Sequence, residues 1–190
     1  MIRISEKTMT IHRDKLYAGY VKKSEEIGEK LGALRKSGKA QGNATFSDLR
    51  ALKAEETFAM NGVYLHEWYF KNISGDGNQK NAPELIEALK EKFGSIEDGI
   101  TYMSECGMAA RGWAILAWDP KQGRLMQYNA DSHNQGGVWG CIPIIVLDVY
   151  EHAYFIDFGS DRKAYIEAFW KNFNWAAAET LYLKVRDIKL

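Results

Sequence analysis

The sequence predicts an α+β protein, with a long N-terminal helical hairpin followed by a lobe that has a three-stranded antiparallel sheet and flanking helices. Apolar residues recur at helical spacing in segments 5–36 and 46–73, short strand-like runs begin near residue 112, and helical spacing returns after residue 160. With 46% hydrophobic and 13% aromatic residues, the 190-residue chain suits one compact unit or two small lobes that share a core. We expect a helical hairpin domain at 1–82 and an α+β domain at 83–190.

The first helix is predicted from Ser5, a typical N-cap residue, to about residue 36. Its apolar stripe consists of Ile11, Leu16, Tyr20, Ile27, Leu31 and Leu34. The polar segment SGKAQGN (37–43) predicts a turn, and a second helix runs from Phe46 to the segment SGDGNQKN (74–81). Two long helices joined by a short turn form a helical hairpin.

Two shorter helices are predicted next. Pro83 lies in the favoured first turn of PELIEALKEKFG, and Gly94 ends that helix. SIED (95–98) has the serine-to-acid spacing of a capping box and begins a helix that reaches about Ala110.

The pattern then changes to three short runs: GWAILAW (112–118), RLMQYNA (124–130) and IPIIVLDV (142–149). The turn-like segments DPKQG (119–123) and NQGGVWG (134–140) separate them, which predicts three strands of one antiparallel sheet. The segments DRKAYIEAFWKNF (161–173) and NWAAAETLYLKV (174–185) are predicted to be the final helices.

The composition argues against several classes of protein. Lys plus Arg equals Asp plus Glu at 25 each, so the chain lacks the basic excess of a dedicated nucleic-acid-binding protein. No apolar run resembles a signal peptide or reaches membrane-spanning length, and we expect a cytoplasmic protein. Cys106 and Cys141 lack metal or redox spacing; we expect buried free thiols, with a single disulfide as the alternative.

Histidine occurs only at positions 12, 66, 133 and 152, each time in an apolar, aromatic-rich context. Asp148 follows the apolar run IPIIVL and precedes His152 by four residues, although burying either group without a partner costs free energy. Imidazole and carboxylate are the ligands that iron, manganese or zinc accepts at nitrogen–oxygen sites. Two interpretations follow from the residues: hydrogen-bonded buried Asp–His pairs, or a metal site that ties the hairpin to the sheet.

Three segments resemble the iron/manganese superoxide dismutases: TMTIHRDK (8–15) with Tyr20 following, LH (65–66), and LDVYEHAYF with DRKAYIEAFWKNFNW (147–175). The resemblance extends from about Ser5 to Trp175. It implies one iron or manganese ion per subunit and the disproportionation of superoxide to O2 and hydrogen peroxide. The four ligand positions of the family are all intact and correspond to His12, His66, Asp148 and His152.

The resemblance also implies roles around the metal. His133 corresponds to the Gln or His that the family holds against solvent bound to the metal, and Tyr20 corresponds to the active-site tyrosine. Gly62 matches members that take this outer side chain from the later loop, which favours manganese or tolerance of either metal. Trp113 corresponds to a pocket tryptophan. Glu151 corresponds to the acid that reaches a metal-ligand histidine of the partner subunit, which implies a homodimer or a higher homo-oligomer.

Several positions depart from the family pattern. Leu16 and Tyr17 replace histidines of the substrate channel, Tyr150 replaces a tryptophan, and Phe70 replaces another pocket aromatic. Leu16 cannot make the family's hydrogen bond to the partner's Tyr154, so we expect a looser channel and a weaker dimer. Two alternatives remain: an iron enzyme that activates O2 with an organic substrate, and a degenerate homologue without dismutase activity that holds zinc or no metal and serves a protein interface.

Overall fold

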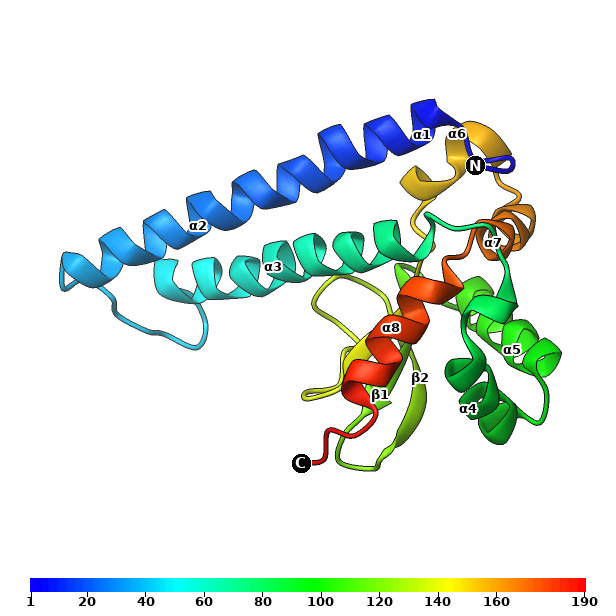
Figure 1. The fold of residues 1–190 in the computed structure, drawn as a ribbon. Helices are drawn as coiled ribbons and strands as arrows, with labels where there is room; N and C mark the ends of the chain where they lie inside the picture. Colours follow the sequence, from blue (N-terminus) through cyan, green and yellow to red (C-terminus); the bar gives the residue numbers. More distant parts are fainter.

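The computed structural model describes residues 1–190 and has the predicted α+β architecture. Two long helical segments lie side by side and extend beyond a body in which helices surround a three-stranded sheet (Figure 1). The first segment comprises α1 (Glu6–Ile11), the π-helical turn η1 (His12–Tyr17) and α2 (Ala18–Lys36), and the second is α3 (Asp48–Asn72). The body comprises η2 (Gln79–Asn81), α4 (Pro83–Phe93), α5 (Ile96–Ala109), β1 (Trp113–Asp119), β2 (Arg124–Ala130), β3 (Ile142–Asp148), η3 (Glu151–Ala153), α6 (Phe155–Phe158), α7 (Arg162–Lys171) and α8 (Trp175–Val185).

The predicted helix caps are confirmed. Ser5 Oγ accepts a hydrogen bond from the Thr8 amide (3.1 Å), and Ser95 Oγ accepts one from the Asp98 amide (3.0 Å). Gly94 ends α4 with a φ of 91°, a left-handed conformation that glycine adopts readily because it has no Cβ. Local side-chain chemistry therefore sets where these helices begin and end.

The first long helix differs from the prediction because it contains the π-helical turn η1. At its end the Ala18 amide donates to the carbonyl of Arg13, five residues earlier. Such a turn holds one residue more than an α-helical turn, and it occurs mostly as a single turn at functional sites. In this chain it begins at His12.

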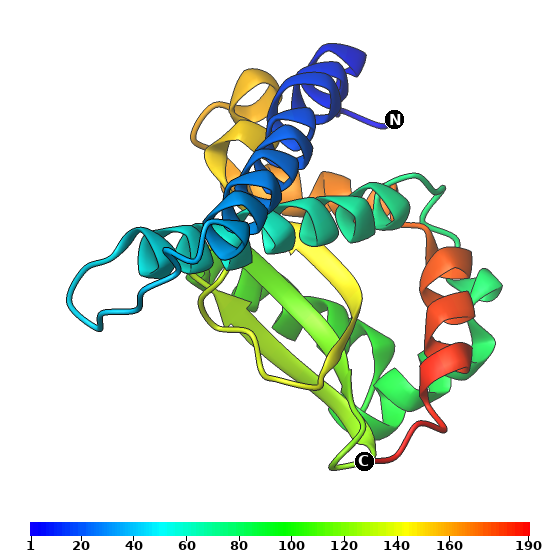
Figure 2. The same ribbon diagram turned by 90° about the vertical axis from the view of Figure 1, so that its left-hand side faces the viewer.

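The sheet has the order β2-β1-β3, and both neighbours of β1 are antiparallel to it. All seven residues of β1 are buried, because the strand is central and helices cover the sheet. Helix α5 packs against β1 and β2, whereas α3 and α8 pack against β3 (Figure 2). The register pairs Trp113 with Asp148, so the start of β1 lies beside the end of β3.

A buried amide fixes the end of α3 on this sheet. Asn72 Nδ2 donates to the carbonyl of Ile144 (3.2 Å), and Asn72 Oδ1 accepts from the amide of Val146 (2.7 Å). A buried side chain that satisfies two backbone groups is costly to remove. The pair of bonds sets how α3 lies along β3, and therefore how His66 approaches Asp148.

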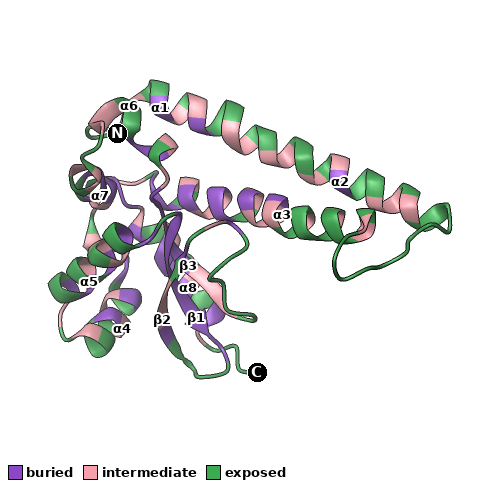
Figure 3. Ribbon diagram, turned by 180° about the vertical axis from the view of Figure 1, so that it is seen from behind, coloured by how far each residue is buried: buried purple, intermediate pink, exposed green.

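Burial is concentrated in the body and in the adjoining part of α3 (Figure 3). Leu65, Tyr69 and Ile73 belong to the same hydrophobic core as the sheet, whereas Ile27 is the one buried residue of α2. The C-terminal end of α3 is thus held by the body, and its N-terminal end by the pairing with α2. The division at residue 82 stays a prediction, and the core crosses it.

Cys106 and Cys141 are free thiols, as predicted, although they are half-buried rather than buried. The Cys141 sulfur lies 3.7 Å from the hydroxyl of Tyr128. None of the helices combines the length and the apolar composition that a membrane span requires.

Candidate metal centre

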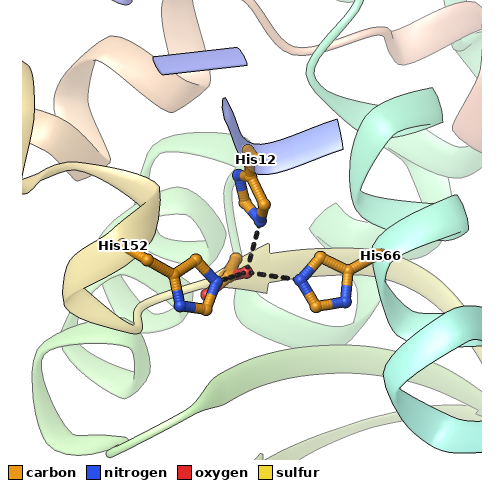
Figure 4. Close-up of side chains that lie close together, drawn as sticks. His12, His66 and His152 are labelled. Atoms are coloured by element: carbon orange, nitrogen blue, oxygen red, sulfur yellow. Dashed lines mark hydrogen bonds and ion pairs between the residues drawn. The ribbon is translucent and has the colours of Figure 1, made fainter. Parts of the chain in front are cut away.

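Four side chains from four elements converge where the two long helices meet the sheet. His12 begins η1, His66 lies in α3, Asp148 ends β3, and His152 lies in η3. One ligand atom of each lies within 4.8 Å of the other three. Figure 4 shows the three imidazole rings pointing toward one carboxylate oxygen. The structure therefore brings together all four residues that the sequence predicts as metal ligands.

The carboxylate of Asp148 lies at the centre of this cluster. Its Oδ2 is 3.2 Å from His12 Nε2, 3.2 Å from His152 Nε2 and 3.7 Å from His66 Nε2. The side chains of His12, His66 and Asp148 are fully buried, whereas that of His152 is 26% exposed. The cluster thus lies inside the protein and reaches solvent on the His152 side.

Hydrogen bonds orient two of the ligand side chains. His66 Nδ1 donates to the carbonyl of Gly62, one turn earlier in α3 (2.5 Å), so the neutral ring carries its lone pair on Nε2. Asp148 Oδ1 accepts from the amide of Tyr150 (2.9 Å), which leaves Oδ2 facing the imidazoles. Outer contacts of this kind orient metal ligands in proteins.

Several buried nitrogens of the cluster have no hydrogen-bond partner. Neither ring nitrogen of His12 makes a hydrogen bond, and neither does His66 Nε2. Buried polar atoms are nearly always paired, so these nitrogens indicate a missing partner. A metal ion between the four ligand atoms would supply one for both Nε2 atoms.

The charge states of His66 and Asp148 suit a metal. Burial lowers the pKa of His66 to about 4, so its imidazole is neutral at physiological pH. Burial acts to raise the pKa of Asp148, but the facing imidazoles of His152 and His12 outweigh it and hold that pKa well below its usual value. Burial opposes protonation of His152 as well, yet the charge of Asp148 raises the pKa of His152. An ionised carboxylate and a neutral imidazole are the forms that bind metal ions.

The spacing also fits a single ion. Ligand atoms at roughly 2.1 Å from one ion are at most about 4.2 Å apart, so the observed 4.8 Å spread needs only a small contraction. Nitrogen and oxygen ligands of this type suit iron, manganese or zinc. The four residues therefore fit the predicted iron or manganese ion.

His133 lies outside the ligand set, in a buried position next to it. Its ring centre is 5.8 Å from that of His66, and its Nδ1 accepts a hydrogen bond from Trp113 Nε1 (3.0 Å). Since indole only donates, Nδ1 is unprotonated and the neutral ring carries its proton on Nε2. Burial lowers the pKa of His133 to about 4. His133 is thus a neutral side chain with an N–H to donate.

The ring of Tyr20 packs against the rings of His66 and His133. Its ring centre is 4.7 Å from His133, edge to face, and 5.3 Å from His66. The rings of Tyr20 and His133 are in contact, but the two side chains form no hydrogen bond with each other. Burial raises the pKa of Tyr20, so its hydroxyl keeps its proton at physiological pH.

Gly62 is the position that accommodates Tyr20. A Cβ added at Gly62 would lie 2.7 Å from Cδ1 and 2.9 Å from Cγ of Tyr20, so no side chain fits there while Tyr20 keeps its place. We expect Gly62→Ala to displace the Tyr20 ring and to lower the free energy of unfolding by about 1–3 kcal/mol, measured by urea denaturation of the metal-free protein.

Gly28→Ala is the matched control, because Gly28 also lies within a helix and its added Cβ would meet nothing within 4 Å. That change should stabilise the protein by about 0.5–1 kcal/mol. Equal stability of Gly62→Ala and wild type would contradict the tight fit of Tyr20 against Gly62.

Tyr150 and Leu16, two of the departures from the family pattern, are both half-buried. The half-buried ring of Tyr150 stacks on His152 at 5.3 Å and lies 6.1 Å from Trp113. Burial raises the pKa of Tyr150 to about 12. Leu16 lies within η1 and is half-buried. Tyr150 thus lies directly against His152 of the cluster.

The two predicted dimer residues behave differently. Glu151 is exposed, whereas Tyr154 is 3% exposed, its ring stacks on Tyr165, and its hydroxyl accepts from Arg162 Nε. Tyr154 is thus buried within its own subunit, and its place at a dimer interface stays a prediction. The exposed aromatic of this segment is Phe155, at 55%.

Three aromatic residues near the centre were missed by the sequence analysis. Phe58 lies 4.6 Å from His133 and 6.1 Å from Tyr20, ring centre to ring centre. Phe58 precedes Gly62 by four residues and His66 by eight, which places all three on one face of a helix. This spacing could have indicated that Phe58 lies near the centre. Tyr165 donates to the carbonyl of Asp148 (2.7 Å), so its hydroxyl oxygen accepts from the hydroxyl of Tyr69 (3.1 Å). No local pattern predicts that contact.

Comparison with known proteins agrees with this geometry. A family model described as "Iron/manganese superoxide dismutases, C-terminal domain" matches residues 80–181. "Superoxide dismutase [Fe]" of Aquifex pyrophilus is 40% identical over 172 residues, which cover 90% of this chain and 81% of that protein. "Superoxide dismutase [Mn]" of Haloarcula marismortui is 35% identical over 181 residues, which cover 95% of this chain and 86% of that protein. The chain therefore belongs to the iron/manganese superoxide dismutase family.

Proposed function

We propose that the protein is a superoxide dismutase that converts superoxide to O2 and hydrogen peroxide at one iron or manganese ion per subunit. The observation that carries this proposal is the buried convergence of three imidazoles and one carboxylate within 4.8 Å. Membership of the family supports it.

His12, His66, Asp148 and His152 would hold the ion. When bound, the ion supplies one-electron redox chemistry by alternating between a trivalent and a divalent state. One carboxylate and neutral imidazoles balance only part of its charge, so the centre stays positive and attracts the superoxide anion.

Two side chains beside the ligands hold protons for this reaction. His133 carries a proton on Nε2 because Trp113 donates to its Nδ1, and Tyr20 keeps its hydroxyl proton. Formation of hydrogen peroxide consumes protons, and a positioned donor speeds such transfers. We therefore assign His133 and Tyr20 to hydrogen bonding and proton delivery at the centre.

The surroundings suit a small substrate. Aromatic rings pack on the ligands from several sides, namely Tyr20, Tyr69, Phe70, Trp113 and Tyr150. On the His152 side a surface pocket of about 570 Å³ includes Tyr150, Glu151 and Arg162. An organic substrate would need room at the ligands themselves, which these rings fill.

We propose that the site accepts either metal. Because Tyr20 packs tightly against Gly62, position 62 cannot supply a side chain next to the metal, and His133 takes that place. This pattern favours manganese or tolerance of either metal. The similar proteins include ones named for iron and for manganese. Metal-free protein reconstituted with iron or with manganese should be active in both forms.

The decisive experiment combines metal analysis with an assay for superoxide, generated by xanthine oxidase. Protein purified without added metal should contain about one iron or manganese ion per chain and should remove superoxide. Protein that holds only zinc, and that stays inactive after reconstitution with iron or manganese, would be the degenerate homologue instead. Metal-dependent consumption of O2 with an organic substrate, without superoxide turnover, would identify the other oxygen chemistry.

We also propose a symmetric dimer at the face formed by Glu151 and the pocket that it lines together with His152 and Arg162. An acid and a half-exposed histidine in one concave patch suit a two-fold interface, in which each patch meets its own copy. The exposed side chain of Phe155 adjoins this patch in the chain and adds apolar area.

Glu151→Ala should weaken the dimer by about tenfold or more, since a carboxylate facing histidine or arginine across an interface stabilises it. Light scattering after size-exclusion chromatography measures the monomer fraction against concentration. Glu97→Ala, an exposed glutamate of α5, is the control and should leave that fraction unchanged. A monomeric wild type at every concentration would contradict the dimer.

A further inference from the structure

A single polar contact joins the two long helical segments near the metal centre. Tyr17 ends η1, and its hydroxyl donates to Oε1 of Glu67 in α3 at 2.9 Å. This is the only hydrogen bond or ion pair between the segment α1–η1–α2 and α3. Each end lies next to a ligand: His12 begins the turn that Tyr17 ends, and His66 directly precedes Glu67.

The contact is part of one packed unit with the ligands. The half-buried ring of Tyr17 lies 5.7 Å from that of Phe70. Phe70 in turn lies 5.2 Å from His12 and 6.0 Å from His66. A change in the position of Tyr17 is therefore passed to both histidines through Phe70.

The turn between His12 and Tyr17 needs such support. A π-helical turn is rare and shifts the side chains on its two sides relative to an α-helix. Apolar contacts alone allow two helices to slide or rotate by small amounts, whereas a hydrogen bond is directional. The hydrogen bond from Tyr17 to Glu67 therefore fixes how η1 is positioned along α3 and how it is rotated toward α3.

We propose that Tyr17 and Glu67 form a clamp that sets the spacing of His12 and His66, and thereby the geometry of the metal centre. They are positioning residues, because they act on His12 and His66 through the packing around Phe70 and would not contact the ion. The inference rests on the proposed function, since it requires that these histidines bind a metal.

The test uses Co²⁺ as a spectroscopic probe bound to metal-free full-length protein. Tyr17→Phe keeps the ring and removes the hydroxyl, and Glu67→Leu removes the acceptor. Each should weaken Co²⁺ binding by about tenfold, as for other outer contacts of metal ligands, and should change the visible absorption of the bound ion. The double variant should be no weaker than either single one, because both remove the same bond.

Two further variants separate this role from general stability. Glu67→Gln keeps an acceptor oxygen and should restore wild-type Co²⁺ affinity and absorption. Asp14→Ala removes the exposed contact of Asp14 with Arg13 in the same turn (2.7 Å) and should leave both properties unchanged. Should Tyr17→Phe unfold, the Glu67→Leu and Glu67→Gln pair gives the same comparison.

The outcomes distinguish the two proposals. Wild-type protein that binds no Co²⁺ would overturn the metal centre and the proposed function with it. Wild-type protein that binds one Co²⁺, together with Tyr17→Phe and Glu67→Leu variants of equal affinity and absorption, would overturn the clamp alone.

Discussion

Replacing Asp148 with alanine is expected to empty the metal centre and abolish dismutase activity. Asp148 supplies the one negative charge of the cluster and lies within 3.7 Å of all three histidine nitrogens. The loss of affinity should exceed the roughly ten- to hundredfold cost of removing an outer contact. The change also leaves the Tyr150 amide without its acceptor, at a cost of about 1–3 kcal/mol. Metal content by mass spectrometry and the superoxide assay measure the result.

The chain offers a matched control at the other end of the sheet. Asp119 ends β1 as Asp148 ends β3, it is also buried, and its Oδ1 accepts from the amides of Lys121 and Gln122. Asp119→Ala should lower the free energy of unfolding by a similar amount while metal content and activity per ion stay normal. Normal metal content in Asp148→Ala would show that Asp148 is not a ligand.

The second large effect is expected at His133. His133→Ala should keep the metal, because His133 lies outside the four-ligand cluster. Turnover should fall by about a hundredfold, the lower range for loss of a positioned proton donor, and the midpoint potential of the metal should shift. Metal content, stopped-flow decay of superoxide and redox titration measure these three properties. Loss of the metal would show that His133 is a ligand.

Two variants test the donor itself. His133→Gln keeps an N–H donor and should retain more activity than His133→Ala. Trp113→Phe removes the indole N–H that fixes the proton of His133 on Nε2, so the ring would populate both tautomers. Its activity should lie between wild type and His133→Ala. Equal turnover of the alanine and glutamine variants would contradict the role as donor.

Much of the fold follows from local patterns. Ser5, Ser95 and Gly94 bound helices where the sequence predicts, because a cap depends on a few neighbouring residues. The strands also lie where predicted, since short apolar runs between turn residues are sufficient to indicate them. The π-helical turn at His12 had no such signal, because its backbone path depends on contacts with α3.

The identity of the candidate metal ligands follows from the sequence, but their convergence does not. The motif around Asp148 and His152 and the two histidines at 12 and 66 indicate the family and its ligand set. Their approach to 4.8 Å depends on the register of Trp113 with Asp148 and on the anchoring of α3 by Asn72. These are contacts between distant segments, which spacing along the chain does not specify.

The sequence by itself determined the α+β class, the helix and strand positions, the four candidate ligand residues and the family. Only the tertiary structure decided that Tyr154 faces inward, that Trp113 fixes the proton of His133, and that Tyr17 meets Glu67. The reason is physical: caps and periodicity are set by neighbours in the chain, whereas these contacts arise from the packing of segments far apart in it.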